Sequence, residues 1–212
     1  MERHAFAMEV KEGRKDDYRK ALGKIWPELT AFLDRNEIKN FSIWNTDSLI
    51  FGYYEKADGS VLSAEEKEIS ERLTKEIEDT FTWISAPGQD MRLMYHDFGV
   101  VRESKELIRH RMFMTKLKPG CEEEYKRRHD EIWPEMTKVL NDAGIRNYTI
   151  WNIRNELFGY YECEKGVEYA AKVQAESSVV KKWDEYMKDI LIMEKDPVTG
   201  AQPLLTQVFS FR

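Results

Sequence analysis

One histidine of this chain lies in a pattern of residues that could transfer protons to and from a bound molecule. Tyr125, His129 and Trp133 recur at spacings of four residues, so in a helix they project from the same face. Histidine has an unperturbed pKa of about 6.5 and can donate or accept a proton near neutral pH. The pattern therefore predicts a candidate acid–base site. The same spacing is also typical of a histidine that is packed and hydrogen-bonded in a hydrophobic core.

A second candidate lies further along the sequence, where Trp183 is followed by Asp184. The face of a tryptophan ring can pack on the apolar C–H face of a sugar ring, and a neighbouring polar group can hold a hydroxyl. Trp183 could instead simply complete a hydrophobic core, and spacing alone favours this alternative.

Both candidates lie in the second of two internal repeats. Residues 18–55 match residues 125–162 without a gap, with 17 identities in 38 positions. An internal duplication of this length predicts two domains. We expect one module over residues 1–101, a polar linker over 102–109 and a second module over 110–212.

Each repeat predicts the same order of elements: strand, helix, strand, strand, helix, strand. In the second repeat we expect strands at 112–117, 148–151, 157–162 and 204–211. We also expect a helix over 125–140, which Pro134 kinks and 142–144 ends, and a second helix over 167–192. This order is typical of the ferredoxin-like fold. A single sheet of this kind exposes an apolar face. We therefore predict an α+β protein in which two tandem ferredoxin-like (βαββαβ) modules form a dimeric α+β barrel within one chain, as an intramolecular pseudo-dimer.

The two repeats differ at the candidate chemical positions. Leu22 occupies the position of His129, and the first repeat has no tryptophan at the position of Trp183. The tyrosine at position 125 is kept as Tyr18. We therefore expect the first module to be structural and the second to be active.

Charge and composition narrow the function. The net charge is −6, and lysines and arginines are interspersed with acidic residues, so no nucleic-acid partner is expected. No apolar run reaches the roughly 18 residues of a membrane span. The first residues carry no apolar signal core, so a cytoplasmic protein is expected. The sequence has no glycine-rich phosphate loop, no serine nucleophile elbow and no zinc-spaced Cys/His cluster, so we expect neither cofactor nor metal.

Four segments of the second repeat resemble the L-rhamnose mutarotase family. They are Glu-Tyr-Lys-Arg-Arg-His-Asp-Glu-Ile-Trp-Pro-Glu at 124–135, Arg-Asn-Tyr-Thr-Ile at 146–150, Lys-Trp-Asp-Glu-Tyr-Met at 182–187 and Thr-Gln-Val-Phe at 206–209. The family is known for dimeric α+β barrels that interconvert sugar anomers without a cofactor.

The resemblance implies that His129 is the proton donor and that Tyr125, Tyr148 and Trp183 bind the sugar. The family typically has two adjacent tryptophans in the late helix, and here the second position is Asp184, which we include among the candidate substrate-binding residues. The first repeat departs further, with Phe41 at the position of Tyr148.

The resemblance implies an isomerase, a sugar mutarotase that acts on L-rhamnose or a related deoxy sugar. Its partner would be a small monosaccharide, and the chain would act as a monomeric pseudo-dimer or as a homodimer. Two alternatives stay open at this point. One is another enzyme of the dimeric α+β barrel fold, such as a cofactor-free monooxygenase or isomerase. The other is a non-catalytic sugar-binding protein.

Overall fold

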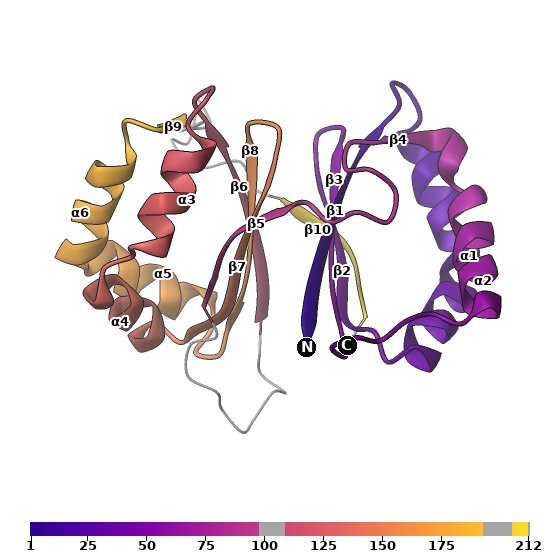
Figure 1. Ribbon diagram of the computed structural model, residues 1–212, viewed down its shortest axis with the longest axis horizontal. Coiled ribbons are helices and arrows are strands. Elements are labelled where there is room, and N and C mark those ends of the chain that lie inside the picture. Colours follow the sequence, from indigo (N-terminus) through magenta and orange to yellow (C-terminus); the bar gives the residue numbers. More distant parts are fainter. Residues whose placement is uncertain (98–108, 193–204, 212) are drawn as a thin grey trace. The chain divides into compact units, whose positions relative to one another are not determined.

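The computed structural model describes residues 1–97, 109–192 and 205–211, which fall into two compact units. Unit 1 consists of Met1–Met91 and the C-terminal segment from Leu205, and unit 2 comprises the described residues between them, starting at Arg92. Each unit has a five-stranded antiparallel sheet with helices on one face (Figure 1).

Unit 1 contains two helices and a sheet of strand order β10-β2-β3-β1-β4. Its elements are β1 (Glu2–Val10), α1 (Lys15–Arg35), β2 (Lys39–Thr46), β3 (Leu49–Lys56), α2 (Ala64–Lys75), the short 3-10 helix η1 (Glu78–Thr80), β4 (Phe81–Trp83) and β10 (Thr206–Phe211). The core lies between the helices and the sheet, where α1 contributes Tyr18, Leu22 and Ile25.

Unit 2 has the same arrangement with more and shorter helices, and its strand order is β5-β7-β8-β6-β9. Its elements are β5 (Arg92–Asp97), β6 (Arg109–Leu117), α3 (Glu122–Asp130), α4 (Pro134–Asp142), β7 (Ile145–Ile153), β8 (Glu156–Cys163), α5 (Val167–Glu176), α6 (Ser178–Met187) and β9 (Leu191–Ile192). The predicted pair of ferredoxin-like modules is thereby confirmed, and the closure of their sheets into one barrel stays a prediction.

The Phe-Gly-Tyr-Tyr-Glu strand has the same packing role in both units. In unit 2, the ring of Phe113 lies over Gly159, and a Cβ added there would lie 1.9 Å from a ring carbon. In unit 1, Phe6 lies over Gly52 at the same distance. Since any larger residue would displace the ring, this contact explains why both repeats have a glycine at this position.

The two helices predicted for the second repeat are each broken in two. Trp133 has an extended backbone, with ψ 134°, and Pro134 is the first residue of α4. Proline fits this position because its missing N–H would have no partner in the helix. Ser177 separates α5 from α6, and its hydroxyl accepts hydrogen bonds from the N–H groups of Val179 and Val180. In unit 1, by contrast, Pro27 lies inside the continuous helix α1.

In each unit, one edge strand of the sheet comes from the other sequence repeat. β10, which ends the second repeat, pairs with β2 of unit 1, and β5, which ends the first repeat, pairs with β7 of unit 2 (Figure 1). The prediction that the last strand completes the second module is therefore wrong. The physical reason is that each module already has its fourth strand, because β4 pairs with β1 and β9 pairs with β6. The outer edges of β2 and β7 therefore remain open to the exchanged strands β10 and β5. Of the predicted linker 102–109, only Arg109, the first residue of β6, lies within the described residues.

Within the described ranges, no helix combines the length and the apolar sequence that crossing a bilayer requires. In the same ranges, no three His, Cys, Asp or Glu side chains gather in a group that could hold a metal ion.

Candidate functional site

His129 lies in the last turn of α3 and is buried, with 6% of its surface exposed. Its Nδ1 atom lies 3.1 Å from the backbone carbonyl oxygen of Tyr125. Because a carbonyl oxygen only accepts hydrogen bonds, Nδ1 carries the hydrogen and donates it. In the neutral ring, Nε2 therefore carries the lone pair and is the atom that can accept a further proton.

Burial lowers the pKa of His129 from its ordinary value to about 4. The hydrogen bond to the carbonyl of Tyr125 and the charge of Asp130 act in the opposite direction, and the loss of hydration outweighs them. This differs from the near-neutral pKa expected from the residue type. At neutral pH the imidazole of His129 is therefore uncharged, and it begins any proton transfer as an acceptor.

Three aromatic side chains surround the imidazole ring. Tyr125 stacks on it, with ring centres 4.2 Å apart and planes at 29°. Trp183 meets it edge-on, with centres 5.4 Å apart and planes at 89°, and Tyr95 does so at 5.3 Å and 62°. Rings in these arrangements hold the imidazole in one orientation.

Tyr148, from β7, completes the cluster on the sheet side. Its ring centre lies 5.7 Å from that of Tyr95 and 5.9 Å from that of Phe113. Burial raises the pKa of the Tyr148 hydroxyl well above its ordinary value, and neighbouring tyrosines and the charge of Asp184 raise it further. The hydroxyl therefore stays protonated at neutral pH.

Helix α6 brings Trp183 and Asp184 to the site in different ways. Trp183 is buried and also packs edge-on against Trp133, with ring centres 5.2 Å apart. Asp184 remains exposed, yet partial desolvation raises the pKa of its carboxyl group. The predicted residues Tyr125, His129, Tyr148 and Trp183 are thus brought together, and Asp184 lies at the edge of their cluster.

Tyr95 is a member of the cluster that sequence reasoning missed. It lies in β5, which belongs to the first repeat by sequence and to the sheet of unit 2 by pairing. Its hydroxyl shares a hydrogen bond with Thr137 of α4, and burial raises the pKa of that hydroxyl. The exchanged strand therefore supplies one wall of the site.

Arg128 is the second residue that sequence reasoning missed. It is 8% exposed and ties α3 to the end of α6. Its guanidinium donates to both carboxylate oxygens of Asp189, at 2.6 and 3.0 Å, and to the backbone carbonyl of Tyr186, whose ring lies 4.4 Å below it. Arg128 thus fixes the helix that carries Trp183 relative to the helix that carries His129. A signal was present in the sequence, because the first repeat has Ala21 at this position.

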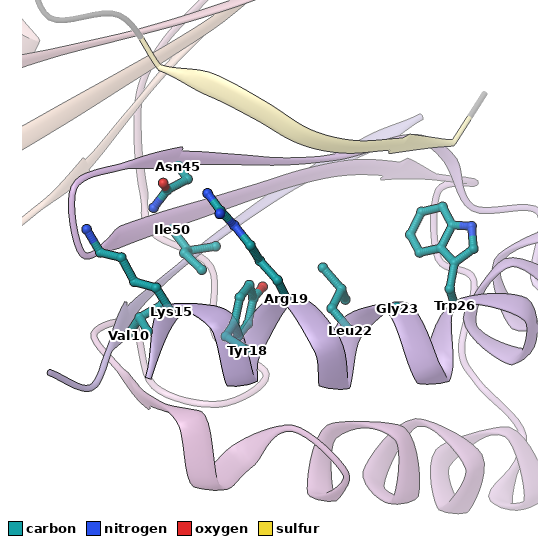
Figure 2. A pocket seen from close by; sticks show the side chains of 9 residues that line it. All are labelled: Val10, Lys15, Tyr18, Arg19, Leu22, Gly23, Trp26, Asn45 and Ile50. Atoms are coloured by element: carbon teal, nitrogen blue, oxygen red, sulfur yellow. The ribbon is translucent and has the colours of Figure 1, made fainter. Parts of the chain in front are cut away.

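The equivalent helix of unit 1 borders a cavity instead of an aromatic cluster around a histidine. Its lining is shown in Figure 2 and includes Tyr18, Leu22 and Trp26, the counterparts of Tyr125, His129 and Trp133. With leucine in place of histidine, this cavity has no group for proton transfer at that position. The cavity and the candidate acid–base residue thus lie in different units.

Comparisons with known proteins give one family. The family model described as L-rhamnose mutarotase matches residues 3–93 and again residues 110–211, which together make up most of the chain. An L-rhamnose mutarotase from Tolumonas auensis is 41% identical over 100 residues, which cover 46% of this chain and 92% of the relative. One from Pectobacterium carotovorum is 39% identical over 93 residues, which cover 42% of this chain and 88% of the relative. Each relative therefore corresponds in length to one repeat.

The chain is also similar to several solved structures, two of which are described here. The crystal structure of an L-rhamnose mutarotase from Formosa agariphila is 29% identical and covers 49% of this chain and 96% of its own, with a TM-score of 0.38. A structure from Lactobacillus acidophilus, described as a candidate monooxygenase, covers 99% of this chain and 100% of its own, with a TM-score of 0.52 and 10% identity. At that identity, the second likeness concerns the fold alone.

Proposed function

Because the chain belongs to the L-rhamnose mutarotase family, we propose that it is an isomerase that interconverts the α and β anomers of L-rhamnose or a related deoxy sugar without a cofactor. The observation that carries this proposal is the neutral, anchored imidazole of His129 within a cluster of tyrosine and tryptophan rings. The family match does not favour another enzyme of the same fold or a non-catalytic binding protein.

Anomerisation requires one proton to leave the anomeric hydroxyl and one to reach the ring oxygen. The C–O bond of the hemiacetal then breaks, the aldehyde carbon rotates, and the ring closes with the opposite configuration. The hydroxyl oxygen and the ring oxygen are both bonded to the anomeric carbon. One basic atom can therefore take the proton from the first and give it to the second. The proton is returned within the cycle, and no oxidant, metal or second substrate is consumed.

We assign this proton transfer to Nε2 of His129. The neutral imidazole accepts the proton of the anomeric hydroxyl, and the imidazolium then gives it to the ring oxygen. An imidazolium with a pKa of about 4 is a strong donor, because the buried site disfavours its charge. His129 thus becomes the proton donor expected from the family resemblance, after it has first acted as a base. Positioned acid–base groups of this kind typically contribute about 10²–10⁴-fold in rate.

The remaining cluster residues are proposed to bind the sugar. Trp183 would pack on the C–H face of the ring, while the hydroxyls of Tyr125 and Tyr148 would hydrogen-bond sugar hydroxyls. Asp184, exposed at the edge of the cluster, would accept a hydrogen bond from a further hydroxyl and so influence which sugar is bound. The chain would work on a monosaccharide in the cytoplasm, as a monomer or a homodimer.

Saturation-transfer NMR on equilibrated sugars tests the proposed activity. L-rhamnose, L-fucose and L-mannose would each be measured with and without the protein, and the magnetisation transferred between anomers gives the exchange rate. We expect faster exchange for at least L-rhamnose. Exchange no faster than in buffer for every sugar would refute the proposed function.

A pair of matched variants tests the site separately from the function. His129→Asn should reduce the exchange rate by at least about 10²-fold, since the amide cannot accept the proton at neutral pH. Leu22→Asn, the same replacement at the matched position of unit 1, should leave the rate unchanged. An unchanged rate in His129→Asn would remove the assignment of His129 and leave the mutarotase activity standing.

A further inference from the structure

The cavity of unit 1 has the size of a small-molecule site. Its volume is about 480 Å³, within the range of ligand pockets. The residues that line it are Val10, Lys15, Tyr18, Arg19, Leu22, Gly23, Trp26, Asn45 and Ile50 (Figure 2). All of them belong to β1, α1, β2 and β3, so the cavity lies between the first helix and the sheet of one unit.

The side chain of Tyr18 brings a buried hydroxyl to this cavity. Tyr18 is 3% exposed, and its hydroxyl oxygen makes no hydrogen bond to any described residue. Leaving a buried hydroxyl unpaired costs free energy, which a ligand with a hydrogen-bonding group would recover. Burial also raises the pKa of this hydroxyl, so it can donate a hydrogen bond at any physiological pH.

Apart from Asn45, whose amide nitrogen already donates to the carbonyls of Asp47 and Leu49, the rest of the interior is apolar. Leu22 and Ile50 are buried beside Tyr18, and Val10 and Trp26 extend the same surface. This lining fits the ring or hydrocarbon part of a ligand and offers few groups to a molecule with many hydroxyls. A monosaccharide is therefore a poor match for the interior of this cavity.

Two cations lie at one side of the cavity. Lys15 and Arg19 project from α1 on the side where Tyr18 also points (Figure 2). Lys15 lies 3.1 Å from Asp47, and Arg19 lies 4.0 Å from Asp16. All four side chains are at least half exposed, and exposed ion pairs of this kind are weak, so an anionic ligand can compete for both cations.

The cationic pair is specific to unit 1. The counterpart of Lys15 in the second repeat is Glu122, and α3 begins with three successive glutamates. An anion would therefore meet two cations in the first unit, but Glu122 and a single cation, Lys126, at the matching positions of the second.

We propose that the cavity of unit 1 is a non-catalytic binding site for a small amphipathic carboxylate. The carboxylate lies between Lys15 and Arg19, and the apolar ring rests on Leu22 and Ile50. A polar substituent on the ring pairs with the hydroxyl of Tyr18. The proposal does not depend on the proposed mutarotase activity, because it concerns residues of the other unit.

A methyl NMR titration with 4-hydroxybenzoate tests the site. In full-length protein with ¹³C-labelled methyl groups, we expect saturable shifts at Val10, Leu22 and Ile50. Benzoate, which lacks the group facing Tyr18, should bind several-fold more weakly, and so should the uncharged 4-hydroxybenzyl alcohol. If no shift appears at these methyl groups up to 10 mM probe, or if the shifts lie in unit 2, the proposal is overturned.

Variants separate the charges from the hydroxyl. Lys15→Gln with Arg19→Gln should weaken 4-hydroxybenzoate binding at least fivefold and abolish its salt dependence. Tyr18→Phe should remove the preference for 4-hydroxybenzoate over benzoate. The control is Lys126→Gln, at the position matching Arg19 in unit 2, which should leave the affinity unchanged. Equal affinity in the double variant and the wild type would contradict the site, and the variants of unit 1 should retain the anomer exchange of the wild type.

Discussion

Unit 1 and unit 2 share a scaffold but differ in what their first helices present. Both have the same strand order, and both have a phenylalanine ring that packs on a strand glycine. At the matching helix position, unit 2 has His129 in an aromatic cluster, while unit 1 has Leu22 beside a cavity. The residues common to both repeats therefore explain the fold, and the residues that differ mark the candidate chemistry.

The helices that carry these residues also differ in continuity. α1 runs through Pro27 without interruption, whereas α3 ends one residue after His129 and α4 starts at Pro134. The break lets Trp133 pack against Trp183, a residue that has no counterpart in unit 1. The break between α3 and α4 is therefore explained by the packing of Trp133 in the aromatic cluster.

The largest expected difference between the units is in their response to acid. The pKa of His129 is about 4 in the folded protein and about 6.5 when unfolded. Between these values the unfolded chain binds more protons, so stability present above pH 6.5 is lost as the pH falls towards 4. The loss amounts to about 3 kcal/mol. Urea unfolding at pH 7, 5.5 and 4 should show this slope in the wild type and a clearly smaller slope in His129→Leu, in which paired carboxylates such as Glu124 and Asp189 still lose stability in acid.

The matched control for this experiment is Leu22→Met, which changes the same position of unit 1 without adding or removing a titrating group. Its pH slope should equal that of the wild type. If His129→Leu keeps the full slope, the stability loss has another source and the depressed pKa is wrong.

A second experiment breaks the shared scaffold in one unit at a time. Gly159→Ala and Gly52→Ala each place a methyl group against a phenylalanine ring, so each should lower the free energy of unfolding by about 1–3 kcal/mol. Only Gly159→Ala should also slow anomer exchange, because the displaced ring of Phe113 packs against Tyr148. Equal exchange rates in the two variants would show that the Phe113–Tyr148 contact does not position the sugar.

A third experiment makes unit 2 resemble unit 1 at the residue that ties its helices together. Arg128→Ala installs the residue that unit 1 has at Ala21 and releases α6 from α3. We expect the KM for the sugar to rise roughly 3–10-fold, because Trp183 loses its fixed position. The control variant Lys138→Ala, which removes an exposed ion pair with Asp142 in α4, should leave the KM unchanged. Similar effects in both variants would contradict the positioning role of Arg128.

The smallest effect is expected at Tyr95. Tyr95 pairs with Ile150 in the sheet of unit 2, and Phe209 pairs with Ile43, the counterpart of Ile150, in the sheet of unit 1. Tyr95→Phe therefore gives unit 2 the residue that unit 1 has at the matching position. The change removes the hydrogen bond with Thr137 and should cost about 0.5–1 kcal/mol of stability. A double-mutant cycle with Thr137→Val measures the coupling, and strictly additive losses would show that the bond contributes nothing.

The sequence repeats predicted the fold class, and the sequence as a whole named most residues of the aromatic cluster around His129. Residues on one helix face, such as Tyr125 and His129, come together because helix geometry is local. Trp183 and Tyr148 could be added through the family resemblance. Tyr95 could not be assigned, because both 92–97 and 206–211 have the pattern of a strand, and the edge on which each pairs depends on the whole sheet.

Two further features also depended on surroundings that no local pattern contains. Both repeats have Ile-Trp-Pro-Glu, yet only the second breaks its helix there, where Trp133 has Trp183 to pack against. The pKa of His129 was expected near its ordinary value, whereas burial among aromatic rings lowers it. In both cases tertiary packing outweighs the preference of the residues themselves.

The exchanged strands have a consequence for how the chain folds during synthesis. β2 is synthesised well before β10, the strand that pairs with its outer edge in the described part of the chain. Until β10 has been synthesised, that edge presents unpaired backbone groups on which another nascent chain could add a strand. Completion of unit 1 also requires two strands that are far apart in the sequence to pair, which favours a slow last step. Unit 1 can therefore be completed only after unit 2 has been synthesised.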